Sequence, residues 1–210
     1  METPEQPRAA RRSTGEWLFQ LTTITLGVLI ALSFDAVLKW NADRTLVDEA
    51  RAMIALEIAD NRRSLERHRA AFPDRMARID TMLKLIGELE AGTEPTVHEI
   101  DLSMGIPSLG TAAWQTADRT GALALMEYAE VQQLADVYAL QSLATDNLKD
   151  ALRTVNHAGS FFLATNDPFA MSPAARDAVR TRTLELRAYL QLDEQLGRQL
   201  LEGYVSYDGL

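Results

Sequence analysis

The chain has no cysteine among its 210 residues, which excludes disulfides, thiolate zinc sites, iron–sulfur clusters and cysteine nucleophiles. Its seven prolines and eleven glycines lie mostly at the edges of periodic segments, which excludes a low-complexity or collagen-like polymer. Basic residues are also fewer than acidic ones. The 21 basic and 30 acidic residues give a net charge of -9, which argues against a general nucleic-acid binder. A hydrophobic content of 47% is enough to bury the core of one domain.

The negative charge is confined to one part of the chain. Residues 1–40 hold four basic and four acidic side chains, so the whole net charge of -9 lies in residues 41–210. Three of the four basic side chains, Arg8, Arg11 and Arg12, come before Trp17. This distribution predicts a short basic tail over 1–16, an apolar helix over 17–40 and an acidic domain over 41–210.

The apolar segment has the length of a membrane-spanning helix. Residues 17–38 contain one ionisable group, Asp35, and as a helix they would extend about 33 Å, close to the hydrocarbon core of about 30 Å. Trp17 and Trp40 bracket the segment, where indole rings favour the two headgroup regions. The threonines at 22, 23 and 25 can return their hydroxyls to helix carbonyls. We therefore predict a transmembrane helix in the lipid bilayer.

Two other interpretations compete with a transmembrane helix in this segment. A cleaved signal peptide would use the tail arginines and the small residues Ala31 and Ser33, but the apolar run continues past them to Leu38. A buried core helix would not explain the bracketing tryptophans or the basic tail. An uncleaved anchor is favoured. Because a short basic flank stays inside while a long domain crosses largely regardless of charge, we expect the N-terminus in the cytoplasm and residues 41–210 on the opposite side of the membrane.

The anchor also carries small residues at helical spacing. Thr23, Gly27 and Ala31 form a small-x-x-x-small series, which allows two helices to approach closely in lipid. The series predicts a homodimer, and the alternative is that the chain packs only within one bundle.

Beyond Trp40 the spacing of apolar residues predicts helices throughout. The first of them, continuous with the anchor, buries a stripe of Val47, Ala50, Ile54, Ile58, Asn61, Leu65, His68 and Phe72. Pro73 suits the first turn of a second helix and Gly92 its C-terminal cap. The face of that helix consists of Met76, Ile79, Leu83, Ile86 and Glu90.

The rest of the chain also shows helix-end signals and apolar residues at helical spacing. Thr96 and Glu99 have capping-box spacing, a short helix is expected over 112–119, and Gly121 would stop it. A longer helix is predicted over 127–155, with a face of Val131, Leu134, Tyr138, Gln141, Thr145, Leu148, Leu152 and Val155. After a turn at 166–168, Ser172 caps a helix that begins at Pro173. Its buried face is Val179, Thr183, Leu186, Leu190, Leu196 or Gly197, Leu200 and Tyr204. The predicted fold is all-α: a transmembrane helix continuing into a juxtamembrane antiparallel bundle.

Sequence motifs for chemistry are missing. There is no Glu-x-x-His, no His-Glu-x-x-His, no glycine-rich phosphate loop and no Gly-x-Ser-x-Gly elbow, so the usual metal, nucleotide and hydrolase signatures are absent. We expect His68 at the edge of a packing surface, and His98 and His157 in solvent. The sequence predicts no catalytic, cofactor-binding or metal residue and no enzyme. A site assembled from distant residues stays open as an alternative.

The acidic side chains are interpreted as a solvated surface. Glu57, Asp60, Glu127 and Glu130 are assigned to that surface, with Glu57 at most flanking the apolar stripe. A catalytic carboxylate pair is the alternative that spacing alone leaves open.

Two blocks of the chain resemble a known family. The first runs from Gly27-Val28-Leu29-Ile30-Ala31-Leu32 through Trp40-Asn41 to Ala55-Leu56-Glu57-Ile58-Ala59-Asp60-Asn61. The second contains Trp114-Gln115-Thr116-Ala117 and Thr120-Gly121-Ala122-Leu123, followed by a helix from Glu127 through Tyr138. Both are similar to the DUF6090-like family of uncharacterised bacterial membrane proteins. The chain departs from the family pattern at residues 36–39 and in having Thr120 where serine is usual.

This resemblance implies a single-span helical protein of the bacterial inner membrane and supplies no catalytic residues. Trp114, Gly121 and Leu123 are then interpreted as structural: an aromatic core anchor, a helix stop and a buried apolar contact. The function predicted is a non-enzymatic module whose helical domain binds an unidentified protein or a second copy near the membrane. The alternative is a small-molecule sensor, because ligands can lodge between the helices of a bundle.

Overall fold

The computed structural model describes residues 14–97, 101, 103–163 and 171–208, and in these residues it is all-α. The elements are α1 (Thr14–Ala70), α2 (Phe72–Ala91), α3 (Ala112–Arg119), the 3₁₀ helix η1 (Ala122–Leu125), α4 (Tyr128–Leu163) and α5 (Pro173–Asp208). The chain divides into two compact units, Met1–Asp48 and Glu49–Leu210. We call them the first unit and the second unit.

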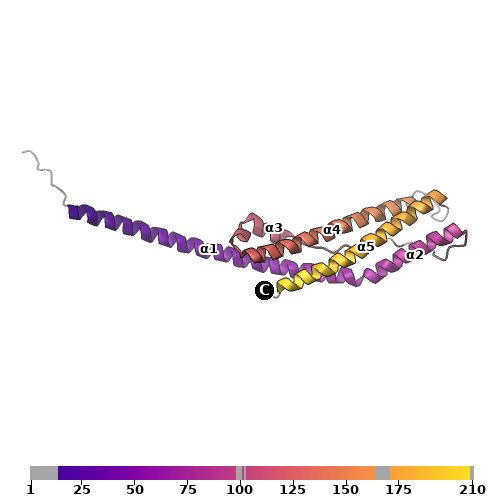
Figure 1. Ribbon diagram of the computed structural model, residues 1–210, viewed down its shortest axis with the longest axis horizontal. Coiled ribbons are helices and arrows are strands. Elements are labelled where there is room, and N and C mark those ends of the chain that lie inside the picture. The colour runs from indigo at the N-terminus through magenta and orange to yellow at the C-terminus, as the bar shows by residue number, and fades with distance from the viewer. Residues whose placement is uncertain (1–13, 98–100, 102, 164–170, 209–210) are drawn as a thin grey trace, which may run out of the picture. The chain divides into compact units, whose positions relative to one another are not determined.

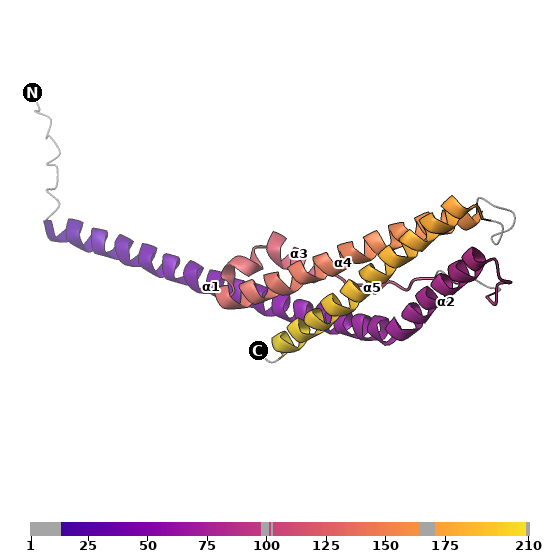
Figure 2. The ribbon, with the colours of Figure 1, turned by 45° about the vertical axis from the view of Figure 1, so that its right-hand side comes forward.

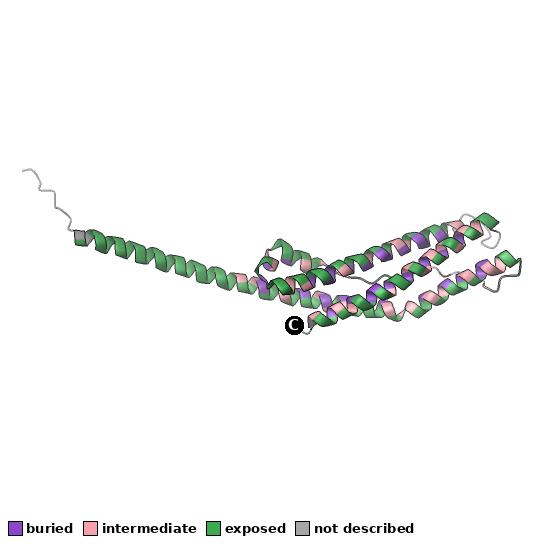
Figure 3. Ribbon diagram, viewed as in Figure 1, coloured by how far each residue is buried: buried purple, intermediate pink, exposed green. Residues whose placement is uncertain are grey.

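The first unit contains the apolar part of α1. Figure 3 shows this part of the helix exposed on every side, and its large side chains, from Trp17 to Trp40, are all more than half exposed. The hydroxyls of Thr22 and Thr23 each donate to the carbonyl four residues earlier at 2.9 Å, as the sequence predicts. By length and composition, this helix is long and apolar enough to cross a membrane.

The second unit is a bundle of four helices, which confirms the predicted fold class. In both views α4 and α5 lie side by side, and α2 packs along α5 (Figures 1 and 2). The final part of α1 reaches α4 through Arg51 and Glu130, whose two bonds measure 2.8 and 2.6 Å. It reaches α5 through Arg69 and Glu194. The pair of helices α4 and α5 therefore packs against α1 along one half of its length and against α2 along the other half.

The break between α1 and α2 is one residue long and has a local cause. Only Ala71 separates the two helices, and Pro73 lies in the first turn of α2. Proline has no N–H to donate to the carbonyl four residues earlier, and its ring collides with that carbonyl in a continuous helix. The carbonyl of that residue, Arg69, therefore has no partner in Pro73, and at the same turn the carbonyl of His68 accepts the N–H of Ala71 at 3.3 Å.

The helix ends mostly follow the predicted chemistry. Gly92 caps α2 with a left-handed φ of 67°, and the N–H of Thr93 donates to the carbonyl of Glu88 at 3.1 Å, the pattern of a Schellman motif. Ser172 accepts the N–H of Ala175, and α3 has the predicted bounds. One length differs: α4 continues past the predicted end at Val155 to Leu163, because no proline interrupts its sequence.

Two predicted features lie outside the described residues: the partner Glu99 of the Thr96 capping box, and the turn at 166–168. Thr96 itself binds another carboxylate. Its N–H and hydroxyl donate to Glu88 at 2.8 and 2.6 Å, and the hydroxyl bond holds the pKa of Glu88 below its usual value.

The core is built from the predicted faces with one exception. In the half that contains α2, one cluster joins Ile79, Ala151, Val155, Leu186 and Leu190, and a second joins Met82, Leu85, Ile86, Met171 and Val179. On α2 the predicted face is rotated: Met76 and Leu83 are half-buried and Glu90 is exposed, whereas Arg75, Met82 and Leu85 are buried. This helix packs along α5 on a face that includes a charged side chain.

Candidate functional site: two buried polar clusters

The first polar cluster lies where α1 ends and α2 begins. We call it the joint cluster, and it consists of His68 on α1, Arg75 on α2 and Asp193 on α5, which are 7%, 3% and 3% exposed. Arg67, His68 and Arg69 form the last turn of α1, where positive charge is favourable to the helix dipole. Buried charges of this kind are tolerated in proteins when they are paired and hydrogen-bonded.

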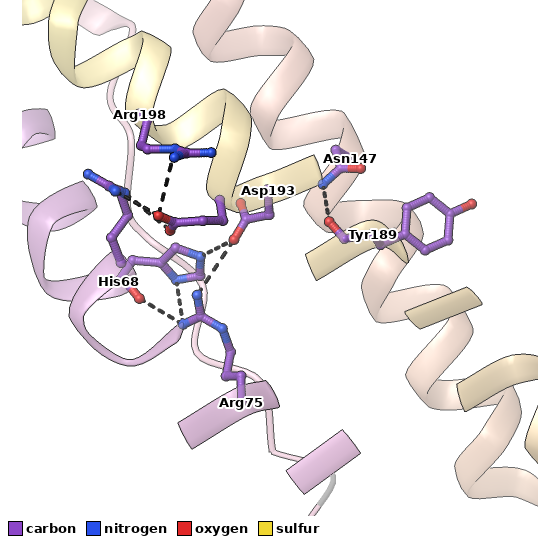
Figure 4. Close-up of polar contacts among 8 residues, drawn as sticks. His68, Arg75, Asn147, Tyr189, Asp193 and Arg198 are labelled. Atoms are coloured by element: carbon purple, nitrogen blue, oxygen red, sulfur yellow. Dashed lines mark hydrogen bonds and ion pairs between the residues drawn. The ribbon is translucent and has the colours of Figure 1, made fainter. Parts of the chain in front are cut away.

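The contacts in this cluster define the state of the histidine. Nε2 of His68 lies 2.8 Å from Oδ2 of Asp193, and Nδ1 lies 3.4 Å from Nη1 of Arg75. A guanidinium can only donate hydrogen bonds, so Nδ1 must accept. Nε2 is then the ring nitrogen that donates to Asp193, and the dashed lines in Figure 4 mark both contacts.

Arg75 on α2 contacts both the last turn of α1 and Asp193 on α5. Its Nη1 donates to the carbonyl of His68 at 2.8 Å, and its Nη2 lies 3.6 Å from Oδ2 of Asp193. Burial lowers the pKa of Arg75, and the nearby Asp193 carboxylate opposes that shift. One side chain from α2 thus satisfies the last turn of α1 and pairs with α5.

A half-buried ion pair flanks the joint cluster. Arg69 donates two bonds to Glu194, at 3.2 and 2.7 Å, and the hydrogen bond to that carboxylate raises the pKa of Arg69. Arg198 approaches the same carboxylate at 3.9 Å. On the other side of α5, Asn147 donates to the carbonyl of Tyr189 at 3.0 Å (Figure 4).

A histidine oriented by a carboxylate is a common arrangement for a general base, but here the geometry argues against that chemistry. A general base needs one ring nitrogen within reach of a substrate proton. In the joint cluster one nitrogen faces Asp193, the other faces Arg75, and the residue is 7% exposed. The arrangement instead fixes the positions of three helices relative to one another, which is a recognised role of buried polar groups.

The second polar cluster holds the connection between α2 and α3 onto the bundle. We call the described residues of this connection, 93–97, 101 and 103–111, the strap. Glu57 on α1 accepts the N–H of Ala113 at 2.9 Å and the hydroxyl of Tyr138 at 2.7 Å. The N–H of Trp114 lies at 3.4 Å. Thr111 gives α3 no side-chain cap, so a carboxylate from another helix satisfies the free N–H groups of its first turn.

The strap is also bound through its backbone at Gly110. Asn61 pairs with this residue in both directions, donating to its carbonyl at 2.8 Å and accepting its N–H at 2.6 Å. Gln141 donates to the same carbonyl at 2.8 Å, and its own oxygen accepts the hydroxyl of Tyr204 at 2.6 Å. A Cβ at Gly110 would lie 3.2 Å from Glu57, so glycine permits this close approach. Together, Glu57, Asn61, Tyr138, Gln141 and Tyr204 form the strap cluster.

Both tyrosines of the strap cluster are held neutral. Burial, followed by the hydrogen bond to Glu57, raises the pKa of Tyr138 far above its usual value. Burial and then the charge of Glu57 raise the pKa of Tyr204. Trp114 stacks on Tyr138 with ring centroids 5.1 Å apart, so an aromatic pair covers this cluster.

The residues predicted for the membrane anchor all lie on the exposed apolar part of α1. Trp17, Thr23, Gly27, Ala31 and Trp40 are exposed on α1 in the first unit. Arg44 lies 5.8 Å from the centroid of the Trp40 ring.

In the second unit Trp114 is half-buried against Tyr138. Gly121 follows α3 with a φ of 79°, and Leu123 is half-buried in η1. His157 is exposed as expected, His68 is buried rather than at an edge, and His98 lies outside the described residues.

Sequence reasoning missed the residues that pair across helices. The sequence assigns Glu57 and Glu130 to a solvated surface, with Glu57 at most flanking the apolar stripe, but both are half-buried and bound to other helices. Arg75 and Asp193 were not singled out at all. One signal for these clusters was available: Asn61 interrupts the apolar stripe of α1. The spacing of the stripe shows that Asn61 faces the core, but it does not show which residue binds it.

No metal centre is indicated by the part of the chain that the structure describes: no three His, Asp or Glu side chains there are grouped to hold an ion. Comparisons of the chain with models of protein families, with curated proteins and with solved structures give no match. The resemblance to the DUF6090-like family stays a prediction from the sequence.

Proposed function

We propose that this protein is a membrane-anchored helical module that binds another protein at the bacterial inner membrane and has no enzymatic activity. The observation that carries the proposal is the apolar part of α1, whose large side chains from Trp17 to Trp40 are all more than half exposed. A helix that is apolar on all sides needs an apolar environment, and lipid provides one on every side. The second unit is then the functional part, held close to the membrane.

The two polar clusters support binding over catalysis or ligand sensing. Each cluster joins side chains from three helices and directs their polar atoms at one another. Polar groups used in this way are not available to a substrate. The cavity beside Arg75 has a volume of only about 20 Å³, whereas sites for organic ligands measure about 300–1,000 Å³. Two larger hollows, of about 440 and 400 Å³, reach that size, but both are open surface grooves and neither is lined by a residue of the two clusters. Open grooves on a helical surface suit a protein partner better than an enclosed small molecule.

The proposed orientation follows from the charge distribution. Arg8, Arg11 and Arg12 lie in a short flank, which the positive-inside tendency retains in the cytoplasm. Residues 41–210 would then lie in the periplasm. Because the chain has no cysteine, single cysteines can report this topology without a background signal.

The topology experiment uses a matched pair of conservative substitutions in the full chain. Ser206→Cys lies on an exposed position of α5, and Ser13→Cys lies before the anchor. Intact cells are treated with a membrane-impermeant maleimide, and the membranes are then washed with alkali. We expect Ser206→Cys to be labelled before lysis and Ser13→Cys only after lysis, both in the membrane fraction. Protein found in the soluble fraction would contradict the anchor, and the reverse labelling would contradict the orientation.

Self-association through Thr23, Gly27 and Ala31 is the partner proposal that can be tested first. Oxidation of Gly27→Cys in membranes is compared with oxidation of Leu29→Cys, which lies two residues away on another face of the helix. A parallel homodimer through the small residues predicts a disulfide-linked dimer for Gly27→Cys and little for Leu29→Cys. Equal cross-linking at both positions, or none, would remove the homodimer and direct the partner search to other proteins.

A further inference from the structure

Two hollows open on the surface where α4 and α5 lie side by side (Figure 1). The first, of about 400 Å³, lies between Asp136 on α4 and Gly203 on α5. The second, of about 440 Å³, lies between His157 on α4 and Glu185 on α5. Among the described residues, each hollow is lined by α4 and α5 alone, so α1 and α2 leave this surface open.

The two hollows lie on the same face of the helix pair. The helices run in opposite directions, since a Cβ on Gly203 would lie 3.2 Å from Val137, whereas further along α4 Asn147 donates to the carbonyl of Tyr189. Residues at steps of three and four share one face of a helix. Such steps lead from the first hollow to the second on both helices, through Leu140, Leu143, Asn147, Asp150 and Thr154 on α4 and through Gln199, Gln195, Leu192 and Ala188 on α5.

The surface between the hollows is apolar at its centre. Leu143 and Leu192 are 55% and 43% exposed, and no acidic or basic residue occurs over 137–145 on α4 or 188–192 on α5. We call the two hollows and this surface the α4–α5 groove. From Asp136 to His157 it extends about 32 Å at about 1.5 Å per residue. An exposed apolar surface of this kind, with hollows at both ends, marks a site for another molecule.

The charges along the groove restrict what covers it. Asp136 is exposed and has no ion pair among the described residues, and no basic residue lines its hollow. At the second hollow, Arg182 pairs with Glu185 at 2.7 Å, so their charges cancel. A second copy in the same direction would set Asp136 against Asp136, and one in the opposite direction would set it against the Arg182–Glu185 pair. Neither arrangement supplies a counter-charge, so the occupant must bring its own.

We propose that the α4–α5 groove binds one amphipathic helix of a partner protein, with its apolar side on Leu143 and Leu192 and a Lys or Arg beside Asp136. This inference rests on the proposed function and names the surface and the partner's chemistry. Helices bind in grooves through apolar anchors at positions i, i+3, i+4 and i+7. The hollows take large anchors because Gly203 and Ala178 occupy little of them. The basic residue fixes the direction of the helix in the groove.

The first test selects binding helices with the full chain in lipid nanodiscs. The probe is a displayed library of helices of about 21 residues, the length of the groove, with a fixed leucine stripe and flanking positions that vary among Lys, Glu and Gln. Binders of empty nanodiscs are removed first. We expect Lys to be enriched at one end of the stripe, and selected peptides to bind Leu143→Glu about tenfold more weakly. Leu56→Glu is the matched control, because Leu56 is 62% exposed but lies on α1, and its affinity should be unchanged.

Reversal of one charge tests the basic contact. Asp136→Lys should change the enriched residue at that end from Lys to Glu. Asp60→Lys changes an exposed carboxylate on α1 and should leave the selection as it is. Peptides that bind Leu143→Glu as well as Leu56→Glu would overturn the groove but not the proposed function, since they would show another protein-binding surface. A selection without any binder would contradict both.

Fluorescence quenching tests where the peptide lies. Dyes are attached to Ala135→Cys beside the first hollow or to Asn156→Cys beside the second, both exposed positions of α4. A nitroxide on the Lys end of a selected peptide should quench the dye at 135 and not the dye at 156. Equal or reversed quenching would overturn the placement. Disulfide-linked dimers of Leu143→Cys in membranes would show a second copy in the groove and overturn the choice of occupant.

Discussion

Glu57→Ala tests how much one carboxylate contributes to holding the first turn of α3 on the bundle. The substitution removes the acceptor for the N–H of Ala113 at 2.9 Å and for the hydroxyl of Tyr138 at 2.7 Å. A hydrogen bond to a charged group contributes about 1.5–3 kcal/mol, and loss of a helix cap costs about 1 kcal/mol. The N–H of Trp114, at 3.4 Å, adds little. Because Tyr138 is 6% exposed and is left without this acceptor, we expect a loss of about 3 kcal/mol in the free energy of unfolding.

The assay is urea unfolding of the full chain in micelles, followed by far-ultraviolet circular dichroism and by the fluorescence of Trp114. Trp17→Phe and Trp40→Phe remove the other two tryptophans from the signal. Asp60→Ala is the matched control: it removes a carboxylate from the same helix, but one that pairs only with exposed Arg63 in the described contacts. We expect that control to change stability by less than about 0.5 kcal/mol. A loss below about 1 kcal/mol for Glu57→Ala, or one equal to the control, would refute the argument.

Three further predictions concern the same bundle. Asp193→Ala leaves buried Arg75 without its carboxylate and should lower the free energy of unfolding by about 3–5 kcal/mol in the same urea assay. The control Asp146→Ala breaks an exposed pair with Lys149 and should have little effect. Comparable losses for the two variants would contradict the role given to the joint cluster. Because the pKa values of Tyr138 and Tyr204 are raised in the folded state, the unfolded chain loses these protons first, near pH 10. The free energy of unfolding from urea titrations should fall as the pH rises above that value, by about 1.4 kcal/mol per pH unit for each tyrosine, and Tyr138→Phe should halve the slope. Gly92→Ala places a side chain at a φ of 67° and should cost about 1–2 kcal/mol, measured by thermal unfolding against Gly105→Ala, a position with no atom crowding an added Cβ.

Local chemistry made part of the fold predictable. Pro73, Gly92 and Ser172 mark helix ends through the hydrogen bonds that their own backbone or side chain can or cannot make, so the sequence around each residue is sufficient. The same holds for the buried faces of α4 and α5, where apolar residues recur at helical spacing. These features need no knowledge of the neighbouring helix.

The polar clusters could not be predicted because they depend on that neighbour. Glu57 and Asp60 lie three residues apart with the same charge, yet one accepts bonds from α3 and α4 while the other remains in solvent. Arg75 is buried because Asp193, 118 positions later in the sequence, lies opposite it. Periodicity identifies an exposed or buried face, but it does not identify the partner that makes a buried charge acceptable.

The single residue between α1 and α2 also affects how the bundle comes apart. α1 covers one half of the α4–α5 pair and α2 covers the other half. Release of α2 therefore removes one packing partner from its half and leaves the other half covered by α1. Local opening in proteins follows such contiguous units. Amide hydrogens should therefore divide into two protection classes, with an abrupt boundary at Ala71 along α1 and α2 and a gradual one within α4 and α5. The joint cluster lies at that boundary, so its integrity decides whether the two halves open separately or as one.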